Sequence, residues 1–376
     1  MGNIEQILSE LIKFKTDKEE TSNKPIVDYI SSILEKHNLE YVRLKNKKTG
    51  LESIVASINC ALKESEPTLF LSGHMDTVVT NAEGWKVTKP LEPLIKDGKV
   101  YGLGAADMKS AIAVYLDSIE AFKQIGSGII LSFTNDEETD IESIKDVMIF
   151  LKKNNIHPKF GFLGEPTDNQ IAIRSTGYMG FKTTVFGPAG HSTQKNKATP
   201  IYVAAQIILF IERMYVAYRG MHTSFHVGTI KGGECRNSLP TSAEFDWEMR
   251  FVKKGPAAVG VKQILELHRE IRDHNEFDVR VKTYETIPSY VEGPHTELVK
   301  TLRKILPQSD LYQLTYATEA GYIKRYGMKT VILGPGKEEN AHAFDEYVEI
   351  ENLYKYQDIL LQFLKMQKNK NKPNKN

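Results

Sequence analysis

The sequence predicts an α/β protein with a mostly parallel sheet and helices on both faces, into which a second, smaller α+β domain is inserted. Strand-like and helical segments alternate along the first part of the chain, which is typical of βαβ units. After Arg174 the pattern changes to half-exposed, alternating strands, and past Ile287 the first pattern returns. A chain of 376 residues is also long for a single hydrophobic core, so two domains are expected.

The elements of the larger domain follow from the spacing of apolar residues. In the first helix, Ile4, Ile7, Leu8 and Leu11 form an amphipathic stripe. Short apolar runs between polar loops predict buried strands. In chain order the expected segments are helices at 3–14, 23–37, 106–122 and 144–152, and strands at 53–58, 68–71, 128–133 and 160–163.

The inserted domain is predicted from alternating strands around two apolar helices, a combination typical of a small α+β sandwich. After it, a helix, a strand and a closing helix restore the α/β pattern, so the larger domain is built from both ends of the chain. We expect the larger domain at 1–176 and 287–376 and the inserted domain at 177–286. The later segments are strands at 180–186, 227–230, 243–252, 277–283 and 329–333, and helices at 200–215, 259–272, 295–305 and 351–364.

Composition argues against several classes of partner. The formal net charge is +1, so no global basic field predicts nucleic-acid binding. No apolar run is expected to reach the length that spans a bilayer, and the first residues lack the pattern of a signal peptide. Cys60 and Cys235 make neither a disulfide framework nor a zinc knuckle, which favours a reducing compartment. We therefore expect a cytoplasmic protein that binds neither nucleic acid nor membrane.

Acidic and histidine side chains follow several of the predicted strands. His74 and Asp76 come directly after the strand at 68–71, and at this spacing they share one face of an extended chain. A histidine can donate a lone pair to a metal while a carboxylate holds its other ring nitrogen. Taken alone, such a pair is more often an ordinary polar pair at the end of a strand. The further positions of this kind are Asp107, Asp136, Glu137, Glu138, Glu165 and His342.

Together these positions predict a metal site, because ligands gather outside the carboxyl ends of the strands in an open parallel sheet. Imidazoles and carboxylates suit zinc or another borderline divalent ion. The carboxylates outnumber the ligands of one catalytic zinc, whereas two metals that share a carboxylate use about five protein ligands. Of the adjacent Glu137 and Glu138, one could coordinate while the other stays free as a general base. Asp107 alone would be read as the N-cap of the following helix.

One motif points elsewhere and is rejected. Gly102 and Gly104, followed by Asp107, open a helix and resemble the turn that binds dinucleotides in dehydrogenases. The third position is aspartate rather than glycine or alanine, which would place a negative charge beside a pyrophosphate.

Seven motifs carry a family resemblance. The chain resembles the dinuclear zinc aminoacylase and peptidase family, which includes acetylornithine deacetylase, succinyl-diaminopimelate desuccinylase and the glutamate carboxypeptidases. The motifs occur in family order and span nearly the whole chain. They are SGHMDTV at 72–78, GLGAADMKS at 102–110, TNDEE at 134–138, LGEPT at 163–167, GPAGHST at 187–193, GTIKGGECRNSLP at 228–240 and GPGKEENAHAFDEYVE at 334–349.

The resemblance implies a role for each residue at the strand ends. His74 and Glu165 match the ligands of one metal, Glu138 and His342 match those of the other, and Asp107 matches the bridge between them. Asp76 matches the carboxylate that orients His74. Glu137 matches the catalytic base, which deprotonates the metal-bridging water and passes the proton to the leaving amine. The Asp107–Met108 peptide bond is expected to be cis.

The resemblance also implies substrate contacts outside the metal site. His191 matches a histidine that stabilises the oxyanion, and in dimeric relatives this histidine reaches the partner's active site. Asn237 also lies in the inserted domain, and Arg250 matches an arginine that contacts a substrate carboxylate. The loop at 316–321, with Glu319 and Gly321, resembles the loop of acetylornithine deacetylases, where Glu319 would pair with the side-chain amine of the substrate.

The implied protein is a two-metal amidohydrolase, with zinc or cobalt as cofactor and a small N-acyl amino acid as substrate, most closely N-acetylornithine. The inserted domain would serve as a lid and dimerisation domain of a homodimer. The alternatives are a succinyl-diaminopimelate desuccinylase, a metallodipeptidase or carboxypeptidase of the same family, and a non-catalytic metal- or amino-acid-binding protein on the same fold. The sequence departs from the family pattern at Leu103, where relatives carry arginine, and at Ser110, where glycine is common.

Overall fold

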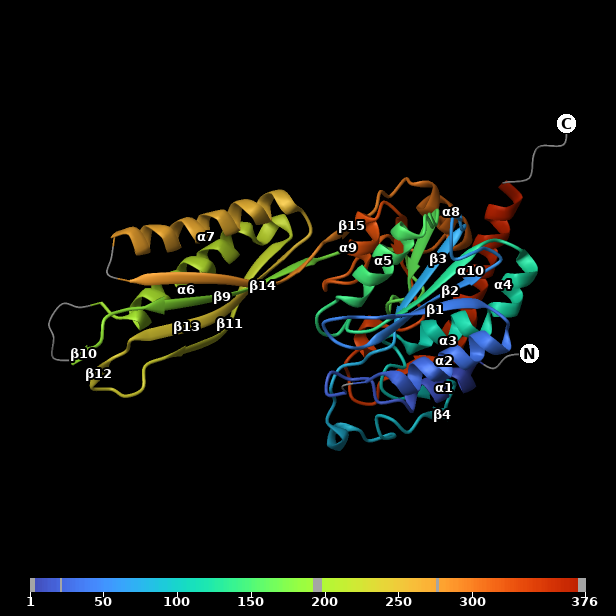
Figure 1. Cartoon of the computed structure of the whole chain (residues 1–376), viewed down its shortest axis with the longest axis horizontal. Helices are drawn as coiled ribbons and strands as arrows, with labels where there is room; N and C mark the ends of the chain where they lie inside the picture. Colours follow the sequence, from blue (N-terminus) through green and yellow to red (C-terminus); the bar gives the residue numbers. More distant parts are fainter. Residues whose placement is uncertain (1–3, 21, 192–197, 275–276, 371–376) are drawn as a thin grey trace. The chain divides into compact units, whose positions relative to one another are not determined.

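The computed structural model describes residues 4–20, 22–191, 198–274 and 277–370, and the side chains of His191 and His274 lie outside this description. The chain divides into two compact units (Figure 1). Unit 1 consists of Met1–Arg174, Glu292–Leu314 and Tyr322–Asn376, and unit 2 of Ser175–Val291 and Thr315–Gly321. The assignment of these units as a catalytic domain and a lid or dimerisation domain stays a prediction.

Unit 1 contains the predicted, mostly parallel sheet. The strands of this sheet lie in the order β1-β2-β6-β3-β7-β17-β8, followed by β15 (Tyr290–Val291), and β16 (Tyr312–Gln313) also pairs with β8. The central pairs β6–β3, β3–β7 and β7–β17 are parallel, whereas β1–β2 and β2–β6 are antiparallel. The strands are β1 (Glu40–Lys45), β2 (Glu52–Ile58), β3 (Leu69–His74), β6 (Ile129–Thr134), β7 (Phe160–Leu163), β8 (Ala172–Ser175) and β17 (Lys329–Ile332).

Helices cover both faces of this sheet, as expected for strands that are buried on both sides. Alternate residues of β2, such as Ile54 and Ala56, join one large buried cluster with six helices. Val55, between them, is buried outside that cluster, and α5 (Ser143–Lys153) contacts β2 and β6. The six helices are α1 (Ile4–Ile12), α2 (Lys24–Lys36), α3 (Lys109–Asp117), α4 (Ile119–Ile125), α8 (Glu297–Ile305) and α10 (Ile350–Lys370).

The structure refines the sequence prediction in unit 1 at one helix and several short strands. The helix expected at 106–122 is two helices, α3 and α4, which meet at Ser118, where the hydroxyl donates to the Val114 carbonyl over 2.6 Å. The strand β1 was not predicted, because its residues are at most half-buried and carry no apolar run. The remaining elements are β4 (Leu94–Lys96), β5 (Lys99–Tyr101), β16 (Tyr312–Gln313), β18 (Tyr347–Glu349) and α9 (Ala320–Arg325).

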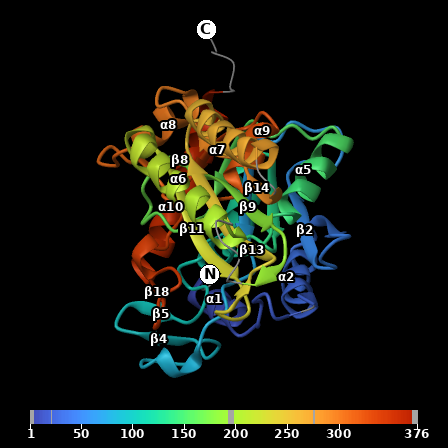
Figure 2. The same cartoon turned by 90° about the vertical axis from the view of Figure 1, so that its left-hand side faces the viewer.

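Unit 2 is the predicted α+β sandwich. Its antiparallel sheet has the order β11-β13-β9-β14, and α6 and α7 lie side by side on one face (Figures 1 and 2). Phe181 and Trp247 stack in its core with ring centroids 4.1 Å apart. The elements are β9 (Gly177–Phe186), α6 (Pro200–Tyr218), β11 (Thr223–Gly232), β13 (Ser242–Phe251), α7 (Lys254–His274) and β14 (Asp278–Ile287), with the short pair β10 (Gly190–His191) and β12 (Ser238–Leu239).

One sequence expectation about membranes is wrong. The segment Pro200–Met221, which contains α6, is long and apolar enough to cross a bilayer by length and composition alone. Glu212 and Arg213 interrupt the run in the sequence, but its mean hydropathy is still 1.4. One such helix is weak evidence for a membrane span, because core helices of soluble proteins meet the same criterion. Only 28% of its most apolar 18-residue window is buried, so α6 also presents an apolar face outside the core.

Candidate metal centre

Three neighbouring parallel strands bring four of the predicted site residues to one edge of the unit 1 sheet, namely His74, Glu137, Glu138 and Glu165. The strand β3 ends at His74, which pairs in register with Thr134 at the end of β6. Glu137 and Glu138 follow β6, and Glu165 follows β7, the other neighbour of β3. Because the carboxyl ends of parallel strands meet at one edge, residues far apart in sequence converge there.

His74 is fully buried and faces carboxylates with both ring nitrogens. Its Nε2 lies 3.1 Å from Asp107 Oδ1 and 3.9 Å from Glu165 Oε2. Its Nδ1 lies 3.1 Å from the backbone oxygen of Asp76 and 3.5 Å from the Asp76 carboxylate. Burial lowers the pKa of His74, but the hydrogen bonds with Asp107 and Asp76 outweigh it, and the pKa lies well above the usual 6.5.

Asp107 also reaches a second group of ligands. While its Oδ1 faces His74, its Oδ2 lies 3.5 Å from His342 Nε2. The same His342 nitrogen lies 2.9 Å from Glu138 Oε1, and this carboxylate raises the pKa of His342 to about 9. The Glu138 backbone N–H in turn donates to Asp76 Oδ2 over 3.0 Å. Asp107 therefore lies between His74, which is fully buried, and His342, whose side chain is half-exposed. The Asp107–Met108 peptide bond is cis, as the family resemblance implies.

Glu137 lies beside these groups, and its potential ligand atoms are within 4.8 Å of those of His74 and Glu138. Burial, and next the neighbouring Glu165 carboxylate, raise the pKa of Glu137 well above the usual value for glutamate. A glutamate whose pKa is raised from its usual value is suited both to accept a proton and to give it back at physiological pH.

The donor set fits two divalent cations. Among the described residues, three groups of three could each hold an ion, and within each group the ligand atoms lie within 4.8 Å of one another. One is His74–Glu137–Glu138; the other two are His74–Asp107–Glu165 and Asp107–Glu138–His342. The last two groups share Asp107, and each combines one imidazole with two carboxylates. Imidazole and carboxylate ligands suit zinc and related ions. Several carboxylates this close repel one another, and bound cations would compensate that charge.

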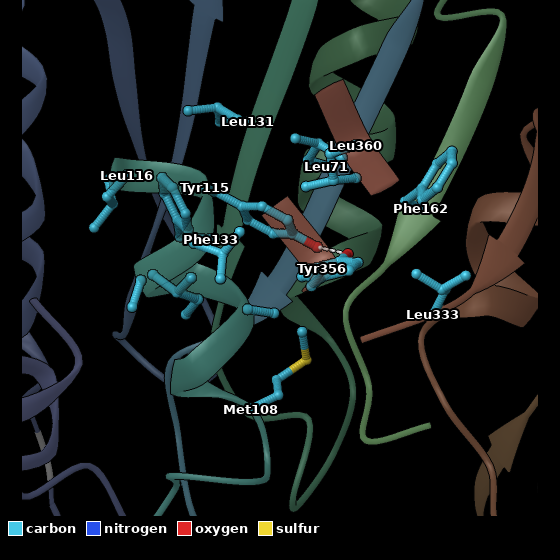
Figure 3. Close-up of a cluster of buried hydrophobic side chains, with 14 of the residues drawn as sticks. Leu71, Met108, Tyr115, Leu116, Leu131, Phe133, Phe162, Leu333, Tyr356 and Leu360 are labelled. Carbon is cyan, nitrogen blue, oxygen red and sulfur yellow. Dashed lines mark hydrogen bonds between the residues drawn. The ribbon is translucent and has the colours of Figure 1, made fainter. Parts of the chain in front are cut away.

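Close packing fixes the strand ends under this centre. The Tyr115 hydroxyl lies 2.9 Å from that of Tyr356 (Figure 3). It also donates to the carbonyl of Ser72, near the end of β3, over 3.3 Å. A Cβ at Gly164, just before Glu165, would lie 2.4 Å from the Ala111 side chain. A Cβ at Gly334 would lie 2.1 Å from the Gly164 carbonyl. These glycines therefore allow α3 and the loop after β17 to approach the backbone of a predicted ligand.

The predicted substrate contacts lie in unit 2, whereas the metal groups lie in unit 1. The backbone of His191 pairs with Ser238, but its side chain lies outside the described residues. Asn237 directly precedes β12. The Arg250 guanidinium lies 2.9 Å from Glu248 Oε1 and 5.4 Å from the Tyr178 ring centroid.

The loop with Glu319 and Gly321 also belongs to unit 2. Glu319 is fully buried. A Cβ at Gly321 would lie 2.0 Å from the Pro288 carbonyl, so packing alone requires glycine there. The substrate roles of these two residues stay predictions.

Two buried charged residues near Asp107 were not predicted to matter. Burial lowers the pKa of Lys109 to about 7, and its Nζ donates to the Phe14 carbonyl over 3.0 Å. Burial raises the pKa of Glu346 to about 8, against backbone N–H groups that lower it. Both residues lie inside family motifs, Lys109 in ADMKS and Glu346 in HAFDEYVE. The sequence did not indicate that they are buried, because each stands beside a residue that is a more obvious metal ligand.

Comparisons with known proteins agree with this geometry. The model of the family described as "Peptidase family M20/M25/M40" matches residues 70–366. An acetylornithine deacetylase of Buchnera aphidicola is 28% identical over 343 residues, which cover 87% of each chain. A succinyl-diaminopimelate desuccinylase of Rickettsia akari is 26% identical over 378 residues, which cover 95% of this chain and 98% of the relative.

The fold has solved counterparts. A tripeptidase from Staphylococcus aureus has a TM-score of 0.80 and 20% identity, and the match covers 97% of this chain and 98% of that one. At this identity the likeness shows the fold alone. The family match, however, spans most of the chain and includes all the residues of the two metal groups. The chain therefore belongs to peptidase family M20/M25/M40 and is a divalent-metal hydrolase that acts on an amide bond.

Proposed function

We propose that this chain removes the acyl group from the α-amine of a small N-acyl amino acid, and that its substrate is N-acetylornithine, which yields ornithine and acetate. The observation that carries the proposal is the pair of ligand groups that share Asp107, with Glu137 beside them. In this proposal His74 and Glu165 hold one cation, Glu138 and His342 hold the other, and Asp107 contacts both.

The chemistry divides between the cations and the side chains. When bound, two cations, zinc or cobalt, would polarise the amide carbonyl and lower the pKa of the attacking water. Glu137 accepts a proton from that water as the new C–O bond forms. It then gives the proton to the amide nitrogen as the C–N bond breaks, which releases acetate and the free amine. Asp76 keeps the His74 ring oriented through Nδ1.

The inserted domain would complete the site. We propose that the His191 side chain stabilises the oxyanion together with Asn237 and that Arg250 binds the substrate carboxylate. Support comes from the motifs that carry these residues. The Arg250 guanidinium donates to the Glu248 carboxylate through Nε, and its remaining N–H groups could donate to a substrate carboxylate. Glu319 would pair with the δ-amine of N-acetylornithine. A Glu319→Gln variant that kept its preference for basic side chains would refute this last assignment.

The second candidate is desuccinylation of N-succinyl-diaminopimelate. The Rickettsia akari relative bears that name and matches 95% of this chain at nearly the same identity as the deacetylase. Dipeptidase or carboxypeptidase action is the third possibility within the family. A non-catalytic binding protein is disfavoured, because a scaffold without activity would not need Glu137 beside a full ligand set.

A substrate panel separates these candidates. Zinc- or cobalt-loaded protein would be incubated with N-acetylornithine, N-succinyl-diaminopimelate and several dipeptides, and amine release measured. We expect turnover of N-acetylornithine that the Glu137→Gln variant abolishes. Turnover of the succinylated substrate alone would move the assignment to the desuccinylase. A chain that binds two cations and hydrolyses none of these compounds would contradict the proposal.

We further propose that the protein is a cytoplasmic homodimer joined through the inserted domain. Both cysteines, Cys60 and Cys235, are free, which favours a reducing compartment. Leu209 and Val216 on α6 are 58% and 62% exposed, and exposed apolar faces of this kind mark interaction surfaces. Light scattering should therefore give twice the chain mass for the wild type and for Ile149→Lys in unit 1. Leu209→Lys should give the mass of one chain.

A further inference from the structure

One buried carboxylate, Glu346, holds the loop that carries Asp107. Its Oε2 accepts the Gly104 N–H over 2.9 Å, and its Oε1 accepts those of Ala106 and Asp107 over 2.8 and 3.0 Å. Its own backbone carbonyl accepts the Gly102 N–H over 2.9 Å. Four amide groups between Gly102 and Asp107 thus converge on a single residue that is 2% exposed.

The other backbone N–H groups of this loop have single partners: the Leu103 N–H donates to the Pro90 carbonyl and the Ala105 N–H to the Gly102 carbonyl. The Gly104 carbonyl accepts the Lys109 N–H over 2.9 Å. Gly102 and Gly104 have φ values of +146° and +81°, which side chains rarely adopt, so the loop's conformation depends on glycine and on these hydrogen bonds.

Glu346 also belongs to the segment that carries His342, four residues earlier. The neighbouring Asp345 Oδ1 accepts the N–H groups of Lys86 and Val87, both over 2.8 Å, which holds this segment independently. The Glu346 carboxylate therefore joins an anchored segment that bears His342 to the loop that bears Asp107. These two residues belong to the same ligand group, Asp107–Glu138–His342.

We propose that Glu346 is a positioning residue for the metal centre, which fixes Asp107 at the spacing from His342 that the second cation requires. The proposal rests on the proposed two-metal function. The group that contains the half-exposed His342 depends on this spacing more than the group built on buried His74, which contacts Asp107 and Asp76 directly. Partners that orient metal ligands typically contribute 10- to 100-fold to metal affinity.

The test compares Glu346→Gln with a matched control, Glu292→Gln. Glutamine keeps one accepting oxygen but turns an NH₂ group towards a backbone N–H of the loop. Glu292 is also buried and accepts backbone N–H groups, from Gly293 over 2.9 Å and Thr330 over 3.2 Å, together with Lys324 Nζ. It lies near the start of β17, whereas His74, Glu138 and Glu165 of the metal groups lie at or after the carboxyl ends of β3, β6 and β7.

Three readouts separate positioning from general destabilisation. Titration calorimetry with Zn²⁺ should show 10- to 100-fold weaker binding of the second cation in Glu346→Gln, and the visible spectrum of the cobalt-loaded variant should shift. In the metal-free state, deuterium uptake by the peptide 102–110 should rise. Glu292→Gln should match the wild type in all three. If Glu346→Gln does not fold, Glu346→Asp keeps the carboxyl group, withdraws it by one methylene and should show the same changes.

Each negative outcome has a distinct meaning. Wild-type affinity, spectrum and uptake in a folded Glu346 variant would overturn the positioning role while leaving the proposed function intact. Equal losses in Glu292→Gln would overturn it as well, because the effect would then be general. A wild-type chain that binds no cation would refute the proposed function and the positioning role together. The uptake of peptide 102–110 would still report whether Glu346 holds the loop.

Discussion

The two units bury polar groups in opposite ways. In the core of unit 2, the Trp247 Nε1–H donates to Thr183 Oγ1 over 3.0 Å, and this hydroxyl lies 3.1 Å from His268 Nε2. His268 Nδ1 donates to the Ile264 carbonyl over 2.6 Å, so the neutral ring has a partner for each nitrogen. In unit 1, the ring nitrogens of His74 and His342 face carboxylates that also face one another.

The difference shows how a structural polar group can be told from a functional one. A buried group that finds neutral partners within the chain stabilises one conformation and needs nothing more. A cluster of like charges at a sheet edge is unfavourable by itself and becomes favourable when cations bind. The predictions below test this contrast, beginning with the largest expected effect.

The largest effect concerns the proton carrier of unit 1. Glu137→Gln should lower kcat by roughly 10²- to 10⁴-fold, the usual contribution of a general base. Metal content should stay at the wild-type value, because neither group that shares Asp107 includes Glu137. Steady-state kinetics with metal analysis measures both quantities. Glu142→Gln, which removes a nearby carboxylate that pairs with Lys145, serves as the control. A variant that loses metal and activity together would assign Glu137 to coordination.

The second effect should change sign with metal. Glu165→Gln removes one negative charge from the buried cluster, so the metal-free protein should become more stable by about 1 kcal/mol. This is the free energy that corresponds to a change of about one unit in the pKa of a group. Zinc at about 1,000 times its Kd should stabilise the wild type by roughly 4 kcal/mol and the variant by much less. Denaturant unfolding with zinc and with chelator measures this. Destabilisation of the metal-free variant would show that Glu165 serves a structural role.

Unit 2 should respond differently to the loss of a hydroxyl. Thr183→Val leaves the Trp247 N–H and His268 Nε2 without a partner and should cost about 1–3 kcal/mol. Zinc should not alter this cost. Thr184→Val changes the neighbouring residue, which points to the other face of β9, and should cost less. Urea unfolding followed by tryptophan fluorescence measures the change in stability. Equal losses of stability in both variants would show that the hydrogen bonds of Thr183 with Trp247 and His268 contribute no more than an ordinary side chain of β9.

The smallest effect is a pH dependence of unit 2. Burial lowers the pKa of His268 from 6.5, partly opposed by the Ile264 carbonyl, so the unfolded chain binds this proton more readily than the folded chain. Stability should therefore fall as pH drops below about 6.5 and keep falling until the folded-state pKa is reached. His268→Gln should show a flatter profile between pH 7 and 5. An unchanged profile would show that other groups govern this range.

The sequence predicts strand ends better than it predicts loops. His74, Glu138 and Glu165 could be placed at one sheet edge because parallel strands align their carboxyl ends, and the structure brings them together with Asp107 and His342. Their roles still rest on the family resemblance. The hydrogen bonds of Glu346 could not be predicted, because they join segments that are about 240 residues apart through backbone groups that carry no sequence signal.

Other misses have similar physical causes. The break between α3 and α4 depends on one serine hydroxyl bonded to the Val114 carbonyl, inside a continuous apolar run. The contacts of Arg250 with Glu248 and Tyr178 could not be predicted either, because residue spacing does not reveal side-chain arrangements. Its expected contact with a substrate carboxylate stays a prediction. Side-chain direction in half-exposed strands depends on neighbours contributed by distant segments.

The central claim is that the carboxylate cluster of unit 1 is a site for two cations that share Asp107. The most direct test counts the divalent ions bound per chain, by titrating metal-free protein with Zn²⁺ in a calorimeter and confirming the count by elemental analysis. We predict two ions per wild-type chain, two per Glu137→Gln chain and at most one per Asp107→Ala chain. A wild-type chain that binds one ion or none, or an Asp107→Ala chain that still binds two, would contradict the account.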